Sequence, residues 1–496
     1  MLFNSLNFLI FFPIAALLYW VLPHKARWVW LLIASYYFYM CWNASYALLL
    51  ATSTLITYLS GLLIGKANRI KNEKKRVRLR KFWVFLSFAL NLGILFFFKY
   101  FSFAIDNLNL ILNALHMKLI TPDFDVLLPV GISFYTFQAL SYTVDIYRGD
   151  LPPERNLGKY ALFVSFFPQL VAGPIERSKN LITQLHEKHT FCYTEVKNGL
   201  LLMLWGFFQK LVIADRAAIL VNQVFNQYNE YAGFQIAIAV LLFAMQIYCD
   251  FAGYSNIAIG AAHVMGFSLM KNFDRPYFSK SIPEFWRRWH ISLSTWFRDY
   301  LYIPMGGNRK GAFRKYFNVM VTFLASGLWH GASWNYVAWG LLHGLYQVIG
   351  GLLKPVRDAV TKLFRMDRNL FSNKLLRILW TFLLVNFAWI FFRAPGISAA
   401  FAIIGKLFSS FNPWIFFDGS LYALGLVQKD FWMLMFALAV LASVSLMQRK
   451  GPLLERLEKQ NIIFRWSLYF TAIFFVLIFG VYGPNFDASA FIYFQF

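Results

Sequence analysis

AGFQIAIAVLLFAMQIYCDFAGYSNI, residues 232–257, is an apolar stretch that contains one charged side chain, Asp250. About 20 apolar residues in a helix suffice to cross the roughly 30 Å hydrocarbon core of a bilayer, and this stretch is longer than that. Eleven further apolar runs lie near residues 4–22, 28–43, 44–65, 82–104, 126–146, 198–222, 316–331, 332–353, 375–393, 430–447 and 466–483. The sequence therefore predicts an all-α polytopic membrane protein in which each of these runs is a spanning helix.

The overall composition agrees with this fold class. Of the 496 residues, 59% are hydrophobic and 14% are charged, whereas a soluble domain carries roughly 25% charged residues. The chain lacks the polar surface that a soluble globule of this size needs, which excludes an ordinary soluble enzyme, a disordered protein and a coiled coil. No internal repeat or Gly/Ser linker divides the sequence, so we expect a single integral membrane domain, 1–496.

Basic residues outnumber acidic ones by 47 to 23, and many of them lie in loops between apolar runs. Residues 66–81 hold nine Lys/Arg and one Glu, which predicts a cytoplasmic loop because cytoplasmic loops are rich in positive charge. Threading the predicted spans through the basic loops places both termini on the extracytoplasmic side. We expect the basic loops to contact membrane lipids with anionic headgroups rather than nucleic acid. The three cysteines lack metal-ligand spacing, so no metal site is expected.

Two stretches are too polar or too interrupted to span as simple helices. They are residues 160–180, YALFVSFFPQLVAGPIERSKN, and residues 281–304, SIPEFWRRWHISLSTWFRDYLYIP. Irregular or charged backbone at membrane depth is tolerated only where protein buries it or where it lines a cavity. Both stretches are therefore expected to be re-entrant or interfacial and to face an internal cavity.

Three of the eight histidines have an unusual sequence context. His330 lies between two apolar runs, His290 follows a Trp- and Arg-rich stretch, and His343 lies within an apolar run. An ionisable residue inside a membrane domain is a candidate functional residue, and an imidazole is able to take a proton from a hydroxyl and return it. The alternative is a buried histidine that makes a structural hydrogen bond. For His343 the neighbouring Gly344 also suggests simple helix packing.

The segment before His290 combines the arginines Arg287 and Arg288 with Trp286 and Trp289. Guanidinium groups bind phosphate or carboxylate through paired hydrogen bonds, so this segment is a candidate site for a phosphate-bearing donor. The alternative is an amphipathic interfacial helix whose arginines reach toward the headgroups. The residue pattern favours neither interpretation.

Polar residues in two other apolar runs are further candidates. Asp250 and Tyr254 would offer a carboxylate and a phenol to a substrate, although Asp250 could instead cap freed backbone N–H groups. Lys210, Asp215 and Arg216 lie close together in a different apolar run. For this group an internal ion pair is expected rather than catalysis.

The C-terminal segment 486–496 ends in FIYFQF and has one phenol, that of Tyr493. A phenol is able to accept and pass on an acyl group when a base is near. Aromatic anchoring at the membrane surface is the alternative, and the chemistry of the residues alone favours it.

Taken together, these segments resemble the membrane-bound O-acyltransferase (MBOAT) superfamily, and within it the bacterial alginate and peptidoglycan O-acetyltransferases. The matching stretches are FPQLVAGPIER at 167–177, CDFAGYS at 249–255, NFDRPYFSKSIPEFWRRWHISLSTWFRDYLYIPMGGNR at 272–309 and GLWHGASWN at 327–335. The resemblance covers most of the chain and is densest from about residue 165 to 345.

The resemblance implies a ring of about 11–13 tilted helices with re-entrant segments and a central tunnel, in a bacterial cytoplasmic membrane. It implies that His330 is the central catalytic residue and His290 its partner, and that Trp329 and Asn335 of the same motif contact substrate. Acetyl-CoA would be the donor substrate, with no cofactor, and a polysaccharide outside would be the acceptor. Tyr493 becomes a candidate acyl carrier, served by an extracytoplasmic SGNH-type esterase-like partner.

Three other functions remain open at this point. One is transfer of D-alanine or another acyl group from a carrier protein to a cell-wall polymer, as in a related transferase of the same architecture. Another is a non-enzymatic acyl or lipid transporter, although the paired broken helices of repeated halves that characterise many transporters are missing from the sequence. The third is a scaffold for an export complex.

Overall fold

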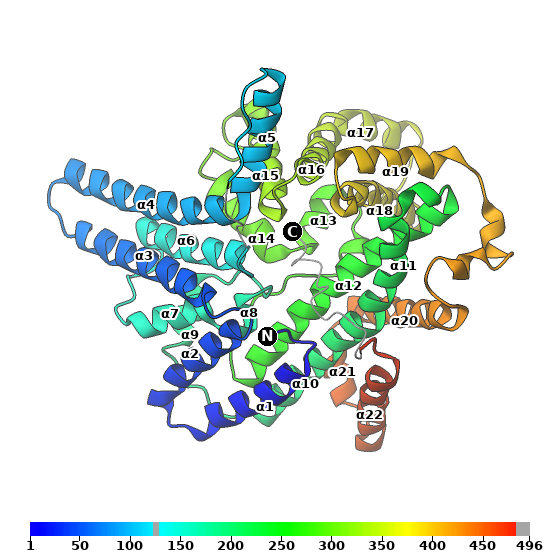
Figure 1. Cartoon of the computed structure of the whole chain (residues 1–496). Coiled ribbons are helices and arrows are strands. Elements are labelled where there is room, and N and C mark those ends of the chain that lie inside the picture. Colours follow the sequence, from blue (N-terminus) through cyan, green and yellow to red (C-terminus); the bar gives the residue numbers. More distant parts are fainter. Residues whose placement is uncertain (123–127, 483–496) are drawn as a thin grey trace. The chain divides into compact units, whose positions relative to one another are not determined.

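The computed structural model describes residues 1–122 and 128–482, and the regular elements in these residues are helices (Figure 1). The chain divides into two compact units. Unit 1 comprises Met1–Leu201 and Ala258–Met270, and unit 2 comprises Leu202–Ile257 and Lys271–Phe496. The helix α12, Phe234–Val264, contributes residues to both. The expectation of a single integral membrane domain stays a prediction.

Unit 1 contains the first nine helices and one π-helical turn. They are α1 (Leu6–Val21), α2 (His24–Met40), α3 (Tyr46–Ala67), α4 (Glu73–Leu95), the π-helical turn η1 (Phe96–Tyr100), α5 (Phe101–Ala114), α6 (Ile132–Arg148), α7 (Leu157–Ser165), α8 (Phe167–Leu170) and α9 (Ser178–Gln184). The helices α3, α4 and α6 pack side by side, as Figure 1 shows. A Cβ atom on Gly61 would lie 2.7 Å from the Tyr142 ring, so the glycine permits the close approach of α3 and α6.

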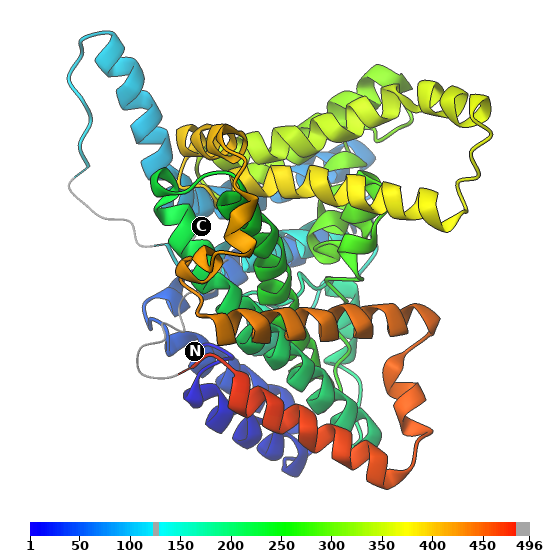
Figure 2. The same ribbon diagram turned by 90° about the vertical axis from the view of Figure 1, so that its right-hand side faces the viewer.

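Unit 2 holds most of the remaining helices. They are α10 (Tyr193–Phe207), the π-helical turn η2 (Phe208–Ala214), α11 (Asp215–Asn226), η3 (Tyr228–Glu230), α12, η4 (Pro276–Phe278), α13 (Ile282–Arg288), α14 (Ile291–Phe297), η5 (Arg298–Tyr302), α15 (Gly311–His330), α16 (Trp334–Leu352), α17 (Lys354–Leu363), α18 (Phe371–Arg393), α19 (Ile397–Ser409), η6 (Pro413–Phe416), η7 (Ser420–Ala423), α20 (Gln428–Met447), η8 (Gln448–Lys450), α21 (Leu453–Glu458) and α22 (Ile462–Phe479). The first turns of α10 belong to unit 1. Figure 2 shows α16 and α18 side by side, with α17 between them in the chain.

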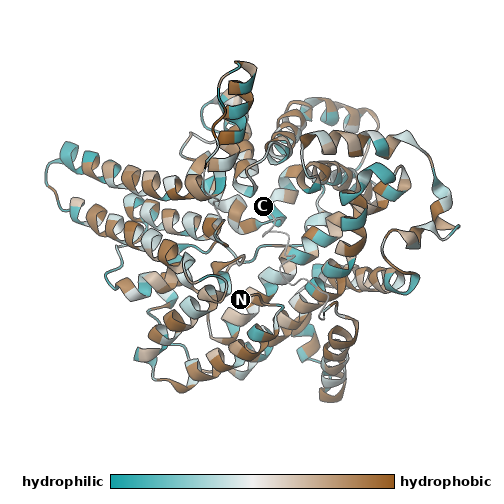
Figure 3. Cartoon of the chain, in the orientation of Figure 1, coloured by the Kyte–Doolittle hydropathy of each residue, from teal (hydrophilic) through white to brown (hydrophobic). Residues whose placement is uncertain are grey.

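The polytopic membrane class is confirmed by the length and hydropathy of the helices. Among the described residues, six helices are long and apolar enough to cross a membrane, or seven if α16 and α17, bent by 51°, form one span. Each of the twelve apolar runs predicted from sequence contributes a helix, but several of these helices are too short or too polar to count. Figure 3 shows α22 as mostly apolar, and most of its side chains are exposed.

Both stretches that were predicted to be interrupted are broken helices. Residues 160–180 form the end of α7, a break at Phe166, the short α8 and an irregular turn. Residues 281–304 form α13, a break at Trp289 and His290, and then α14 with its π-helical extension η5. Their re-entrant position in the membrane stays a prediction.

The pair α15 and α16 is held together by backbone contact. A Cβ on Gly327 would lie 2.3 Å from the Tyr336 carbonyl oxygen, and one on Gly340 would lie 2.4 Å from the Phe323 carbonyl oxygen. Because neither position has room for a side chain, the two helices pack closely here. This contact fixes the C-terminal end of α15, where His330 lies.

Candidate active site

His330 is the last residue of α15, and a glycine makes the turn that follows it. The helix ends at Gly331, whose backbone is extended. A Cβ at Gly331 would lie 2.2 Å from the Tyr336 ring, so the first turn of α16 closes directly over the glycine. The imidazole of His330 is 4% exposed. The turn therefore ends the helix with its terminal side chain inside the protein.

His290 lies in the short break between α13 and α14. Ser281 caps the N-terminus of α13, because its hydroxyl accepts a hydrogen bond from the Glu284 N–H at 3.3 Å. The Glu284 carboxylate in turn accepts one from the Lys280 N–H at 2.9 Å. His290 precedes α14 with φ 42° and ψ 56°, in the left-handed region, and its side chain is fully buried.

The two histidines are brought together although 40 positions separate them in sequence. Their ring centroids are 6.3 Å apart. The Trp329 ring lies beside both, at 5.9 Å from His290 and 5.0 Å from His330. The sequence could suggest each histidine separately, and the structure now places them in one site.

Aromatic rings enclose the pair. Phe251 of α12 lies edge-on to His290 at 4.6 Å. Trp339 of α16 and Phe392 of α18 lie edge-on to His330 at 5.0 and 5.3 Å. Burial lowers the pKa of His290 to about 3, so this imidazole is neutral near pH 7. A neutral imidazole offers one N–H donor and one basic nitrogen, which are the groups that acyl transfer requires.

A second aromatic layer supports this enclosure. The Trp286 indole N–H donates to Nδ1 of the fully buried His343 at 3.2 Å. Trp339 lies 5.0 Å from His343 on one side and 5.0 Å from His330 on the other. The Trp289 and Trp389 rings lie tilted to each other, with centroids 5.1 Å apart. This second layer, formed by Trp286, Trp289 and His343, therefore supports the wall of the site from behind. A Cβ at Gly344 would lie 2.8 Å from the Met320 sulfur, so the helix-packing role predicted for Gly344 also holds.

The two arginines that were predicted to hold a donor lie apart from this enclosure. Arg287 is exposed. Arg288 is partly exposed and its guanidinium pairs with the Glu284 carboxylate at 2.8 Å. The helix α13 turns Phe285 and Trp286 inward and Arg287 outward, as an amphipathic helix does. A role of these arginines in donor binding stays a prediction.

Asp250 belongs to a separate buried cluster. The Lys210 ammonium lies 2.7 Å from the Asp250 carboxylate and 2.8 Å from that of Asp215, so the predicted internal ion pair is confirmed and extended. The interpretation of Asp250 as a helix cap is wrong, because α12 continues past it to Val264. Tyr254 is buried one turn further along α12. Arg216 pairs instead with Asp430, at 3.5 Å.

Of the two remaining predicted site residues, Asn335 lies beside the site and Tyr493 is not described by the structure. The Asn335 side chain donates to the carbonyl groups of Phe391 and Ala394, at 3.2 and 3.0 Å. It thus ties the start of α16 to the end of α18 beside the site. Tyr493 lies outside the described residues. Sequence reasoning did not single out Phe251, Trp339 or Phe392, because isolated aromatic residues in apolar runs carry no signal of their own.

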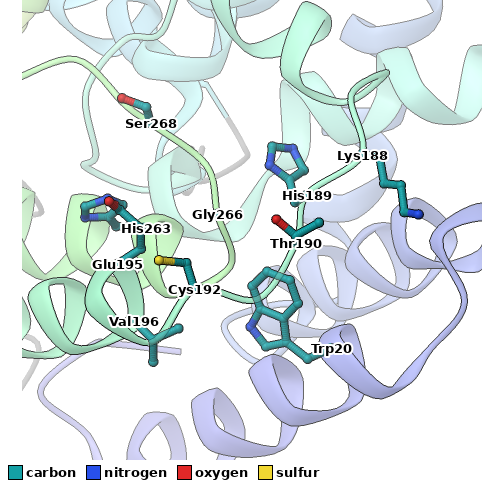
Figure 4. A pocket seen from close by; sticks show the side chains of 10 residues that line it. All are labelled: Trp20, Lys188, His189, Thr190, Cys192, Glu195, Val196, His263, Gly266 and Ser268. Atoms are coloured by element: carbon teal, nitrogen blue, oxygen red, sulfur yellow. The ribbon is translucent and has the colours of Figure 1, made fainter.

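Unit 1 has a pocket of its own, of about 490 Å³, shown in Figure 4. Trp20 of α1, Lys188 and Cys192 of the loop before α10, and Glu195 and His263 are among its lining residues. The carboxylate of Glu195 pairs with the imidazole of His263. None of the residues that were predicted to be functional lines this pocket.

Comparison with known proteins yields one matching family model and several similar proteins. A family model described as "MBOAT, membrane-bound O-acyltransferase family" matches residues 154–392, a range that includes both histidines. A probable alginate O-acetylase of Pseudomonas putida is 41% identical over 417 residues, which cover 84% of this chain and 81% of the relative.

Two more distant relatives carry different substrate names. A peptidoglycan O-acetyltransferase of Helicobacter pylori is 34% identical over 436 residues, covering 82% of this chain and 79% of the relative. A teichoic acid D-alanyltransferase of Streptococcus thermophilus is 30% identical over 246 residues, covering 47% and 59%. The buried histidine pair and these similarities lead to one conclusion: the chain is an integral membrane acyltransferase and belongs to the membrane-bound O-acyltransferase family.

Proposed function

We propose that this acyltransferase moves an acetyl group from acetyl-CoA on the cytoplasmic side to a polysaccharide hydroxyl on the extracytoplasmic side. The observation that carries the proposal is the buried pair of imidazoles with centroids 6.3 Å apart. An active site needs a position about 3 Å from both catalytic groups where the reacting atoms sit. The two imidazoles are close enough to each other to act on one reacting group.

The proposed chemistry follows from the two side chains. His330 takes the proton of the acceptor hydroxyl while the hydroxyl oxygen attacks the thioester carbonyl carbon. The C–O bond forms, the C–S bond breaks, and the proton passes from His330 to the thiolate sulfur that leaves. His290, neutral because it is buried, donates its N–H to the carbonyl oxygen as negative charge develops there.

The aromatic enclosure supports the same proposal. Trp329, Trp339 and Phe392 pack against the histidines on several sides, which keeps bulk water from the thioester. Exclusion of water matters because a thioester that meets water in the site would be hydrolysed rather than transferred. The 24 excess positive charges of the chain would favour a donor that carries several phosphates.

The length of the similarity favours acetyl over D-alanyl transfer. The O-acetylating relatives match 84% and 82% of this chain, whereas the D-alanyltransferase matches 47%. The family also excludes a purely non-enzymatic transporter or scaffold. We therefore propose O-acetylation of a cell-surface polysaccharide, with alginate-like and peptidoglycan acceptors as the two classes to test first.

The remaining parts of the proposal concern the outer face of the membrane. The chain would lie in the bacterial cytoplasmic membrane with both termini outside. Tyr493 would accept the acetyl group on its phenol oxygen, and an SGNH-type partner would move it to the polysaccharide. This relay would carry the acetyl group from the membrane to a polymer outside it.

Intact-mass spectrometry of the purified full chain, incubated with isotopically labelled acetyl-CoA, tests the proposal. We expect labelled protein for the wild type, and unlabelled protein for His330→Ala and Tyr493→Phe. The control is His116→Asn, which removes an exposed histidine. Full labelling of His330→Ala would contradict the assigned base. Labelling of Tyr493→Phe at wild-type level would remove Tyr493 from the relay.

A further inference from the structure

The backbone at His290 adopts a conformation that most residues avoid. Its φ of 42° and ψ of 56° lie in the left-handed region, and the side chain is fully buried. A residue other than glycine is strained in this region, and it persists there only where its surroundings enforce it. The surroundings of His290 should therefore contain the groups that hold it.

Two backbone hydrogen bonds bracket His290. The N–H of Asp274 donates to the carbonyl of Arg288 at 2.9 Å. The N–H of Ile291 donates to the carbonyl of Asn272 at 2.9 Å. The short segment 272–274 thus binds the chain on both sides of His290, two residues before it and one residue after it.

The side chain of Asn272 adds a second set of bonds at the same place. Its Oδ1 accepts a hydrogen bond from the Ser292 hydroxyl at 2.6 Å and a longer one from the Ser292 N–H at 3.4 Å. Its Nδ2 donates to the Ser255 hydroxyl at 3.0 Å. Asn272, Ser255 and Ser292 are all at most 1% exposed. Buried hydrogen bonds of this kind are costly to break, because the groups left behind have no water to bind.

The bonds of Asn272 connect two elements that both reach His290. Ser292 lies in the first turn of α14, two residues after His290. Ser255 lies on α12, one turn from Phe251, whose ring contacts the His290 imidazole at 4.6 Å. The asparagine therefore joins the backbone that carries His290 to the helix that packs against its ring.

We propose that Asn272 is a positioning residue for His290. Its carbonyl and its carboxamide hold the left-handed backbone, and thereby aim the imidazole toward His330. This inference rests on the proposed role of His290 in acetyl transfer. A displacement of about 1 Å in a catalytic group costs up to roughly 100-fold in rate, so Asn272→Ala should lower kcat by about 10- to 100-fold and change KM for acetyl-CoA little.

A double-mutant cycle in the full chain, reconstituted in liposomes with acetyl-CoA, separates positioning from general stability. If Asn272 acts through His290, Asn272→Ala has its full effect in the wild type and almost none in a His290→Ala background. If Asn272→Ala instead lowers the residual rate of His290→Ala by the same factor as that of the wild type, the proposal is overturned. A wild-type kcat for Asn272→Ala would overturn it as well.

Two further variants sharpen the test. Asn272→Asp keeps the size of the side chain and an acceptor for Ser292, so it should retain more activity than Asn272→Ala. Asn91→Ala is the matched control in unit 1, because the Asn91 carboxamide also accepts a 2.6 Å hydrogen bond from a buried serine, Ser53. Asn91→Ala should lower the free energy of unfolding without changing kcat.

Failure of the proposed function itself would give a different result. His290→Ala alone would then transfer acetyl groups at the wild-type rate.

Discussion

Two buried polar clusters lie in unit 2, and they differ in how their groups are spaced. In the ion cluster, Lys210 lies 2.7 and 2.8 Å from the carboxylates of Asp250 and Asp215. In the histidine cluster, the rings of His290 and His330 are 6.3 Å apart and pack against aromatic side chains. Both clusters use α12, since Asp250 and Phe251 are adjacent on that helix.

The difference indicates which cluster is structural. Opposite charges in direct contact inside a membrane domain compensate one another and leave no position for a substrate. The two imidazoles instead pack among aromatic rings and are close enough to each other to act on one reacting group. Burial of an ionisable residue is thus not by itself a sign of catalysis, and the charge of the side chains around it separates the two cases. The following predictions test that separation, beginning with the largest effect.

Substitution of His330 should abolish transfer and leave folding nearly unchanged. General-base assistance contributes about 10²–10⁴-fold, so His330→Ala should lower the rate of acetyl transfer by that factor. The thermal midpoint of the purified protein should stay within a few degrees of the wild type. A variant that loses activity only because it unfolds would contradict the distinction between the two clusters.

Substitution of Lys210 should have the opposite phenotype. Removing one partner of a buried ion cluster leaves charges without compensation and typically costs about 3–5 kcal/mol, so Lys210→Met should lower the free energy of unfolding by that amount. Chemical denaturation in detergent measures this change.

The triple variant Lys210→Met, Asp215→Asn, Asp250→Asn is the control for Lys210→Met. It removes all three charges and should recover most of the lost stability, because well-packed neutral residues often replace buried ion pairs at little cost. If the triple variant folds well but transfers no acetyl group, the ion cluster has a catalytic role after all.

The polytopic membrane class could be predicted from the sequence, because the apolar runs are long and the loops between them are rich in basic residues. Each predicted run contributes a helix, yet only six or seven helices meet the length and hydropathy of a full span. A run such as 316–331 contains enough apolar residues to suggest a span. Its helix, α15, begins at Gly311. The helix therefore also contains polar residues that lie before the apolar run, and these lower its mean hydropathy.

The site was predictable only in part, for a physical reason. His290 and His330 were found because an imidazole is rare in an apolar context. The short distance between them depends on the left-handed turn at His290 and on the glycine contacts of α15 with α16. Neither feature can be predicted from the local hydropathy of the sequence. Asp250 looked equally functional in sequence, because its partner Lys210 lies 40 positions away.

Substitution of His343 tests whether this residue is one of the reacting groups or only supports the wall of the site. His343→Phe keeps an aromatic ring but removes the Nδ1 acceptor of the Trp286 N–H. A buried donor without a partner costs about 1–3 kcal/mol, so the free energy of unfolding should fall by that amount. The rate of transfer should fall less than tenfold, since His343 supports the wall. A loss comparable to that of His330→Ala would place His343 among the reacting groups.

The smallest effect is the pH dependence of stability that His290 confers. Burial lowers its pKa to about 3 in the folded protein, whereas an unfolded histidine has a pKa of about 6.5. Between these values the unfolded state binds a proton that the folded state does not. The free energy of unfolding therefore decreases as the pH falls from about 6.5 toward 3, and His290 accounts for about 2 kcal/mol between pH 7 and 5.

His290→Asn removes this titration and keeps a residue that tolerates left-handed backbone. Its denaturation midpoint should accordingly change less between pH 7 and 5 than that of the wild type. His116→Asn, which removes an exposed histidine, should keep the wild-type dependence. An equal pH dependence in His290→Asn and the wild type would mean that the His290 imidazole is hydrated in the folded protein. The aromatic enclosure around the histidine cluster would then be open to water.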